Sequence, residues 1–199
     1  MSHVQTTLLW ALGVSLVFLL VYPACNAFTE GRAHTWVPAA RAELGIPLRP
    51  GFIWAYFSMY LLFQMPILFL DTASVRALGR RLVLATLASG TLYLLLPTRL
   101  GWPRQVPAAP YAGIFRWMFG LDRPHNLVPS LHVVYSALIV LALLQATRPW
   151  PGRALWITWL LAIGASTVLV HQHHLLDVAS GGLLAGLCHR FGPGREGRP

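Results

Sequence analysis

The sequence predicts an all-α protein, an integral membrane six-helix bundle. Of its 199 residues, 56% are hydrophobic and only 11% are charged, whereas a soluble domain carries about 25% charged residues. Six apolar segments are long enough, or nearly long enough, to cross about 30 Å of hydrocarbon. All 15 basic residues are arginines, placed singly or in pairs between these segments. That placement suits membrane topology and anionic membrane lipids rather than a nucleic acid partner.

The six predicted spans cover residues 8–22, 52–70, 82–97, 131–146, 154–170 and 175–188. The last is the most polar, with Asp177 and Ser180 beside Gly181 and Gly182. Small residues of this kind suit close helix packing inside a bundle. Residues 1–190 therefore form one predicted membrane domain, and the Gly-, Arg- and Pro-rich residues 191–199 form a disordered cytoplasmic tail.

Two of the connecting segments also have helical character. Residues 39–44 follow Pro38 and precede Gly45, which predicts a short capped surface helix. The connection over 98–128 is the longest, and four large apolar residues are bunched at 115–119 around Arg116. That bunch predicts an interfacial helix or lid.

The arginines also orient the predicted bundle. Six spans place both termini on one side, where the loops hold eight arginines against seven opposite. Without Arg99 and Arg123, which are candidate binding residues rather than topology signals, the count is eight against five, so the termini are predicted to be cytoplasmic. The expected location is a bacterial inner membrane, crossed several times, with the active site outward. Cys25 and Cys188 then lie about a bilayer apart, beyond disulfide reach.

Two motifs carry the predicted chemistry. His173 and Asp177 are four residues apart, so on a helix the carboxylate can hydrogen-bond the imidazole and fix its tautomer. Upstream, Pro129 and Ser130 open a long apolar run, with His132 two residues after the serine. A serine at a helix start, beside unpaired backbone N–H groups, makes an anion site. In the predicted six-span arrangement, the third span ends and the fourth and sixth spans begin on the outer face of the membrane, so the two motifs lie on the same side.

Together the motifs resemble those of the type 2 phosphatidic acid phosphatase superfamily. The family's middle motif is Pro-Ser-Gly-His, and residues 129–132 resemble it. Its last motif is Ser-Arg, five residues, His, three residues, Asp, and residues 166–177 reproduce that spacing. Leu131 in place of the glycine, with Asn126 ahead of it, is more similar to the branch that contains inositol phosphorylceramide synthases. The resemblance covers roughly residues 82–187.

The chain departs from the family pattern at two places. The family's first motif is Lys, six residues, Arg-Pro. The chain fits this motif with Arg116 in place of the lysine and with Arg123 and Pro124 at its end, but these residues lie unusually close to Pro129. Thr167 stands where the last motif has Arg, so one phosphate clamp is missing. Another guanidinium must supply the charge. The candidate phosphate-binding arginines are Arg99, Arg104 and Arg123.

The resemblance implies a metal-independent mechanism without a cofactor. His173, oriented by Asp177, would attack phosphorus and form a phosphohistidine. His132 would protonate the departing alkoxide and then activate water or an acceptor alcohol, while Ser130 holds phosphate oxygens. The expected substrate is a lipid phosphate or prenyl diphosphate. Hydrolysis is the preferred outcome, and lipid-headgroup phosphotransfer is the alternative.

Two readings from other classes stay open. In a non-catalytic transporter or scaffold, the His173–Asp177 pair would only pack the last span or gate a path, and Ser130 and His132 would have no task. A zinc site would use His171, His173, His174 and Asp177, again without Ser130. In the catalytic interpretation, His171 and His174 face lipid headgroups and the tryptophans anchor the protein at the membrane interface.

Overall fold

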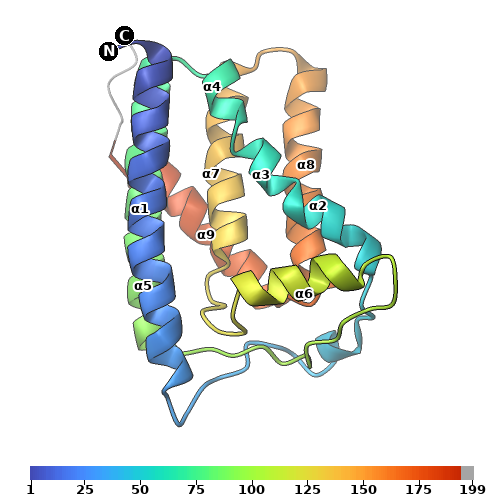
Figure 1. Ribbon diagram of the computed structural model, residues 1–199. Coiled ribbons are helices and arrows are strands. Elements are labelled where there is room, and N and C mark those ends of the chain that lie inside the picture. The colour runs from blue at the N-terminus through green and yellow to red at the C-terminus, as the bar shows by residue number, and fades with distance from the viewer. Residues whose placement is uncertain (194–199) are drawn as a thin grey trace.

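The computed structural model describes residues 1–193, and helices are its only extended regular secondary structure, as the all-α prediction requires (Figure 1). The α helices are α1 His3–Glu30, α2 Ile53–Phe57, α3 Met59–Leu62, α4 Met65–Phe69, α5 Thr72–Leu95, α6 Ala112–Leu121, α7 Leu131–Ala146, α8 Trp150–Leu169 and α9 Leu175–Phe191. Short 3-10 turns cover Glu43–Gly45 and Pro50–Phe52. Isolated bridges join Trp36 to Thr98 and Arg99 to His125.

The central element of the fold is α7, which packs on α5, α8 and α9. Its sequence is apolar on every side, a pattern typical of a helix enclosed by others. Leu138, Val140 and Leu143 are almost completely buried in the main core. The position of α7 therefore fixes where its first residues, including Ser130 and His132, meet the other helices.

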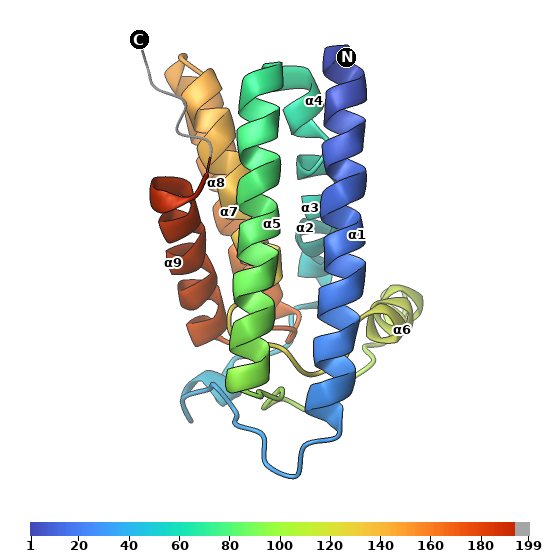
Figure 2. The same cartoon turned by 90° about the vertical axis from the view of Figure 1, so that its left-hand side faces the viewer.

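The longest helix, α1, lies along α5 (Figure 2). Gly79 and Gly90 of α5 lie about three turns apart and face Trp10 and Val21 of α1. A Cβ atom would come within 2.3 Å of the Trp10 ring at Gly79, and within 2.4 Å of Val21 at Gly90. Only glycine at these two positions permits the observed approach of α1 to α5.

The predicted span over 52–70 is not one continuous helix. It is divided into α2, α3 and α4, although the joining residues Ser58 and Phe63 keep helical backbone angles. The Ser58 hydroxyl donates to the carbonyl of Ala55 at 2.7 Å, and Pro66 lacks the N–H that a continuing helix needs. The result is a bent rod of short helices.

Other boundaries also differ from the predictions. α1 extends beyond residues 8–22 at both ends, and α5 begins at Thr72, so residues 72–81 are helical rather than a link. The helix expected over 39–44 is only the turn Glu43–Gly45, because Glu43 turns inward to a buried partner described below. α9 ends at Phe191, and residues 194–199 of the predicted tail lie outside the described part of the chain.

Two described helices, α1 and α8, are long and apolar enough to cross a bilayer. α7 is apolar but has only 16 residues. α5 carries Arg76, Arg80 and Arg81 in its first turns. The all-helical architecture is thus confirmed, while the six-span membrane arrangement stays a prediction.

One end of the bundle collects the predicted motifs. α5 ends there, α7 and α9 begin there, and α6 lies across the same end (Figures 1 and 2). α1 begins, and α9 ends, toward the opposite end (Figure 2).

Candidate functional site

A tight turn between α8 and α9 positions His173. His171 adopts a left-handed backbone with φ 56°, and the N–H groups of Gln172 and His173 both donate to the carbonyl of Thr167, at 2.9 and 3.0 Å. The Nδ1 atom of His173 lies 3.3 Å from Oδ2 of Asp177, whose side chain is completely buried. Because a carboxylate only accepts, Nδ1 carries the proton and Nε2 keeps the lone pair of a nucleophile.

His132 faces His173 directly from the first turn of α7. Its Nδ1 atom lies 3.0 Å from Nε2 of His173, and its Nε2 atom lies 2.6 Å from the hydroxyl of Tyr56 in α2. Tyr56 is only 2% exposed. Tyr56, His132, His173 and Asp177 therefore form one continuous chain of hydrogen bonds.

Ser130 joins the start of α7 to α9. It is the N-cap of α7, with its hydroxyl 3.5 Å from the N–H of Val133, and its own N–H donates to the carbonyl of Asp177 at 3.1 Å. Tyr93 of α5 supports the preceding residue by donating to the carbonyl of Pro129 at 2.7 Å. The serine, the first N–H groups of α7 and the His173–Asp177 pair thus meet at one point.

The three candidate arginines lie in different environments. Arg104 is half-buried and donates to the carbonyls of Phe119 and Asp122, at 3.0 and 2.5 Å. Arg123 forms an exposed ion pair with Glu30. The Arg99 guanidinium is exposed and makes no hydrogen bond or ion pair within residues 1–193.

Thr167, which stands in the place of the family's arginine, does not face the site with a free hydroxyl. It is completely buried and donates to the carbonyl of Gly164 at 2.8 Å. Its role in the described structure is to shape the turn through its own carbonyl.

A buried His174–Glu43 pair supports the same turn. Oε1 of Glu43 lies 3.0 Å from Nδ1 of His174 and accepts the N–H of Leu175 at 2.8 Å. The N–H of Gly101 donates to Nε2 of His174 at 3.0 Å, while the N–H of His174 donates to Oδ2 of Asp177 at 2.7 Å. His174 is therefore a buried structural residue, and its predicted headgroup-facing position is wrong.

Trp102 closes this cluster from the other side. Its ring stacks between His171 and His174, with centroids 4.3 Å from each. His171 also hydrogen-bonds the carbonyl of Ile46 at 2.9 Å, and burial lowers the pKa of His171 below its usual range. His171 is thus held by protein groups, contrary to the headgroup-facing prediction, and Trp102 is a packing residue rather than an interfacial anchor.

Sequence reasoning missed Tyr56 and Glu43, and it assigned Asp122 only a hydrogen bond within its loop. Asp122 follows α6 and accepts the hydroxyl of Tyr22 at 2.6 Å. Burial raises the pKa of the Asp122 carboxyl above its usual range, against the lowering effects of the Tyr22 bond and of His173. Glu43 and Asp122 are isolated acidic residues in loops whose other charged residues are arginines, and that isolation was a usable signal. Tyr56 gave no such signal, because a tyrosine within an aromatic-rich apolar run is expected to be a packing residue.

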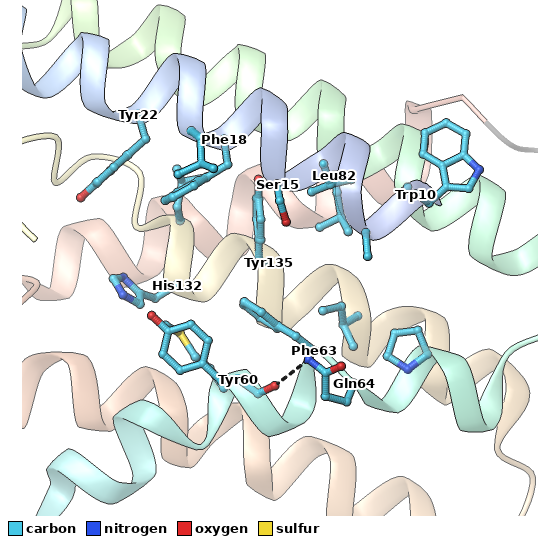
Figure 3. A pocket seen from close by; sticks show the side chains of 18 of the residues that line it. Trp10, Ser15, Phe18, Tyr22, Tyr60, Phe63, Gln64, Leu82, His132 and Tyr135 are labelled. Carbon is cyan, nitrogen blue, oxygen red and sulfur yellow. Dashed lines mark hydrogen bonds between the residues drawn. The ribbon is translucent and has the colours of Figure 1, made fainter. Parts of the chain in front are cut away.

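An elongated cavity of about 660 Å³ leads away from the histidines. It lies between α1, α2–α4, α5 and α7, with His132, His173 and Asp122 at one end and Thr7 and Trp10 toward the other. Figure 3 shows His132 and Tyr22 at one end of this pocket and Trp10 at the other. Most of its lining is aliphatic or aromatic, so it suits a long apolar chain attached to a polar head.

The zinc alternative does not fit this geometry. Within residues 1–193, no group of three or more His, Cys, Asp and Glu side chains could hold a metal ion together. Trp102 separates His171 from His174, and Glu43 binds the latter.

Comparison with known proteins gives one match. The family model described as the PAP2 superfamily matches residues 78–193. Searches of curated proteins and of solved structures each found no match. The matched range contains Ser130, His132, His173 and Asp177, whereas Tyr56 and Glu43 precede it.

Proposed function

This chain belongs to the PAP2 superfamily, whose members are phosphatases and phosphotransferases of phosphate esters, and from that premise we propose that it is a membrane lipid phosphatase. The observation that carries the proposal is the alignment of His132, His173 and Asp177 at the polar end of an apolar cavity. A bound phosphate group would replace the 3.0 Å hydrogen bond between the two histidines, whose rings would move apart to admit it, while its lipid chain lies in the cavity.

In the first chemical step, Nε2 of His173 attacks phosphorus. The bond from phosphorus to the alcohol oxygen breaks with its electron pair on oxygen, and His132, which becomes an imidazolium when the anionic phosphate binds beside it, gives that oxygen a proton. The products are a free alcohol and a phosphohistidine. Asp177 stabilises the positive charge that develops on the His173 ring.

In the second step, His132 takes a proton from a water molecule as the water oxygen attacks phosphorus. The bond from phosphorus to Nε2 of His173 breaks with its pair on nitrogen, which releases phosphate and restores both histidines. Ser130, the first N–H groups of α7 and a nearby guanidinium would hold the non-bridging oxygens throughout. No metal or cofactor takes part in this scheme.

The cavity supports a lipid phosphate rather than a small soluble ester. Its walls run along α1 from Tyr22 to Thr7, a distance of about 22 Å at the helical rise of 1.5 Å per residue. A soluble ester would leave this apolar length without a ligand, whereas an acyl or prenyl chain would fill it. In a bacterial inner membrane with cytoplasmic termini, the site would face outward.

Lipid-headgroup phosphotransfer is the second candidate, and one residue favours it. Leu131 lines the cavity directly beside His132, where it narrows the space for water next to the proposed phosphohistidine. A second lipid alcohol, held in the same cavity, would then take the place of water.

The proposal is tested with purified protein and phosphate release from phosphatidate and prenyl diphosphate, in EDTA, with and without ceramide or diacylglycerol. We expect phosphate release without an acceptor, and its loss by at least about a thousandfold in His173→Ala, as for other nucleophile deletions. His34→Ala, at an exposed histidine, is the matched control and should retain full activity.

Three results would count against the proposal. Full activity of His173→Ala would exclude a phosphohistidine at His173, and loss of activity in EDTA would exclude a metal-independent reaction. Product that forms only when ceramide or diacylglycerol is present would replace the hydrolase by the transferase.

A further inference from the structure

Each histidine of the site is held at one ring nitrogen and faces its partner with the other. Asp177 holds Nδ1 of His173, and Tyr56 holds Nε2 of His132. The two remaining nitrogens, Nε2 of His173 and Nδ1 of His132, lie 3.0 Å apart. Tyr56 therefore occupies, for His132, the place that Asp177 occupies for His173.

We propose that Tyr56 is a positioning residue for the reaction, and that by holding Nε2 of His132 it makes Nδ1 the atom that carries the proton. The inference rests on the proposed function, because it assigns a part in the same reaction. It concerns a residue of α2, which lies outside the range matched by the family. Tyr56 acts through His132 and does not itself touch the reacting atoms.

A hydroxyl suits this position because it both donates and accepts. When His132 is neutral and donates from Nδ1 to His173, the Tyr56 hydroxyl donates to the lone pair on Nε2. When His132 is an imidazolium, the hydroxyl turns and its oxygen accepts a hydrogen bond from the N–H at Nε2. A buried nitrogen is thus satisfied in both charge states, whereas a carboxylate could only accept and would favour the imidazolium.

The proton balance follows from this arrangement. In the first step the imidazolium loses its Nδ1 proton to the alcohol oxygen and becomes the neutral tautomer with hydrogen on Nε2, which donates to Tyr56. In the second step Nδ1 accepts a proton from water, and the imidazolium is restored. Tyr56 keeps its own proton throughout.

The packing around Tyr56 holds the hydroxyl in place. The ring is buried against Ile53, Phe115 and Met118, and its centroid lies 4.8 Å from that of His132. The same ring lines the cavity. Apolar residues of α2 and α6 therefore pack around the Tyr56 ring, while His132 of α7 contacts its hydroxyl and its ring.

Tyr56→Phe tests the proposal, because it removes the hydroxyl and keeps the ring. Two substrates of equal chain length are compared: an alkyl phosphate, whose leaving oxygen needs a proton, and a nitrophenyl phosphate carrying an alkyl chain, whose leaving oxygen does not. The parameter compared is kcat/KM, which reports formation of the phosphohistidine and excludes its hydrolysis. We expect kcat/KM on the alkyl phosphate to fall about tenfold to a hundredfold, from one unsatisfied buried nitrogen. On the nitrophenyl ester kcat/KM should stay within about threefold.

Two controls separate positioning from a general effect on folding. Tyr111→Phe removes a hydroxyl from the apolar cluster that also contains Tyr56, but Tyr111 lies outside the cavity lining, so this variant should turn over both substrates like the wild type. In a His132→Ala background, Tyr56→Phe should cause no further loss on the alkyl phosphate. Equal losses on both substrates, or full additivity with His132→Ala, would overturn the proposal.

A readout without substrate keeps this proposal separate from the proposed function. In protein carrying ¹⁵N-labelled histidine, Tyr56→Phe should shift the Nε2 resonance of His132, and Tyr111→Phe should not. An unchanged His132 resonance overturns the role of Tyr56 even in an active enzyme. A shifted resonance supports it even if none of the tested phosphates is hydrolysed, in which case only the proposed function fails.

Discussion

At the scale of single residues, three arginines are candidates for the guanidinium that would bind the phosphate in the proposed reaction. Arg104 already donates to two carbonyls, and Arg123 pairs with Glu30. The guanidinium N–H groups of Arg99 make no hydrogen bond or ion pair within residues 1–193. The backbone N–H of Arg99 donates to the carbonyl of Trp36 at 2.8 Å, and a backbone bridge to His125 holds Arg99 beside the segment that leads into Ser130.

We therefore predict that Arg99→Ala lowers kcat on a lipid phosphate by about a hundredfold, the effect of removing one transition-state donor. Arg116→Ala, which removes an exposed guanidinium from α6, is the matched control and should change kcat by less than about threefold. The measurement is the initial rate at saturating substrate. A near-normal rate for Arg99→Ala would contradict this prediction and assign the phosphate-binding role to Arg104 or Arg123.

Residue types and spacing predicted which side chains the structure brings together, but not which ones support them. The four-residue spacing of His173 and Asp177 was sufficient, because helical geometry places such pairs on one face. His174 was misplaced because its partners, Glu43 and Gly101, are far away in sequence. No local pattern specifies a contact between residues separated by a whole loop.

At the scale of elements, the approach of α9 to α7 depends on Gly181. A Cβ atom there would lie 2.9 Å from the carbonyl oxygen of Ser130 and 3.1 Å from Cβ of Val133. The same contact region carries the hydrogen bond from the Ser130 N–H to Asp177. Close packing of these helices and the geometry of the site are thus coupled.

Gly181→Ala should destabilise the protein by about 1–3 kcal/mol, as expected for overpacking, and should lower kcat as Ser130 and Asp177 separate. Gly182→Ala is the matched control, since its Cβ would meet nothing within 4 Å and alanine favours a helix by about 1 kcal/mol. Thermal unfolding in detergent and kcat are measured for both variants. Equal behaviour of the two would contradict the coupling.

Apolar runs located most helices correctly, since burial and periodicity act over whole turns. They failed at α2–α4, where one serine and one proline divide an apolar run that composition alone treats as uniform. They also failed at the start of α5, where arginines suggested a link but the N-cap Asp71 begins a helix by accepting the N–H of Ser74 at 2.7 Å.

At the scale of the whole molecule, the predicted orientation can be tested with single cysteines. Cys25 and Cys188 are buried and would be replaced first by alanine. Ala73, Gln105 and Pro193 are exposed and supply three labelling positions. With both termini cytoplasmic, a membrane-impermeant maleimide should label intact cells carrying Gln105→Cys only, and the other two should react after permeabilisation. Labelling of Pro193→Cys from outside would reverse the orientation.

The cavity walls have a consequence for how the chain divides its tasks. The histidines, Ser130 and Asp177 lie in the matched range 78–193, but α1 and α2–α4, which form much of the cavity, precede it. Apart from Tyr56 and Glu43, substitutions in the first 77 residues can therefore reshape the cavity without touching the groups of the proposed phosphate chemistry. The proposed preference for a lipid chain would then change over evolution while the chemistry is inherited unchanged.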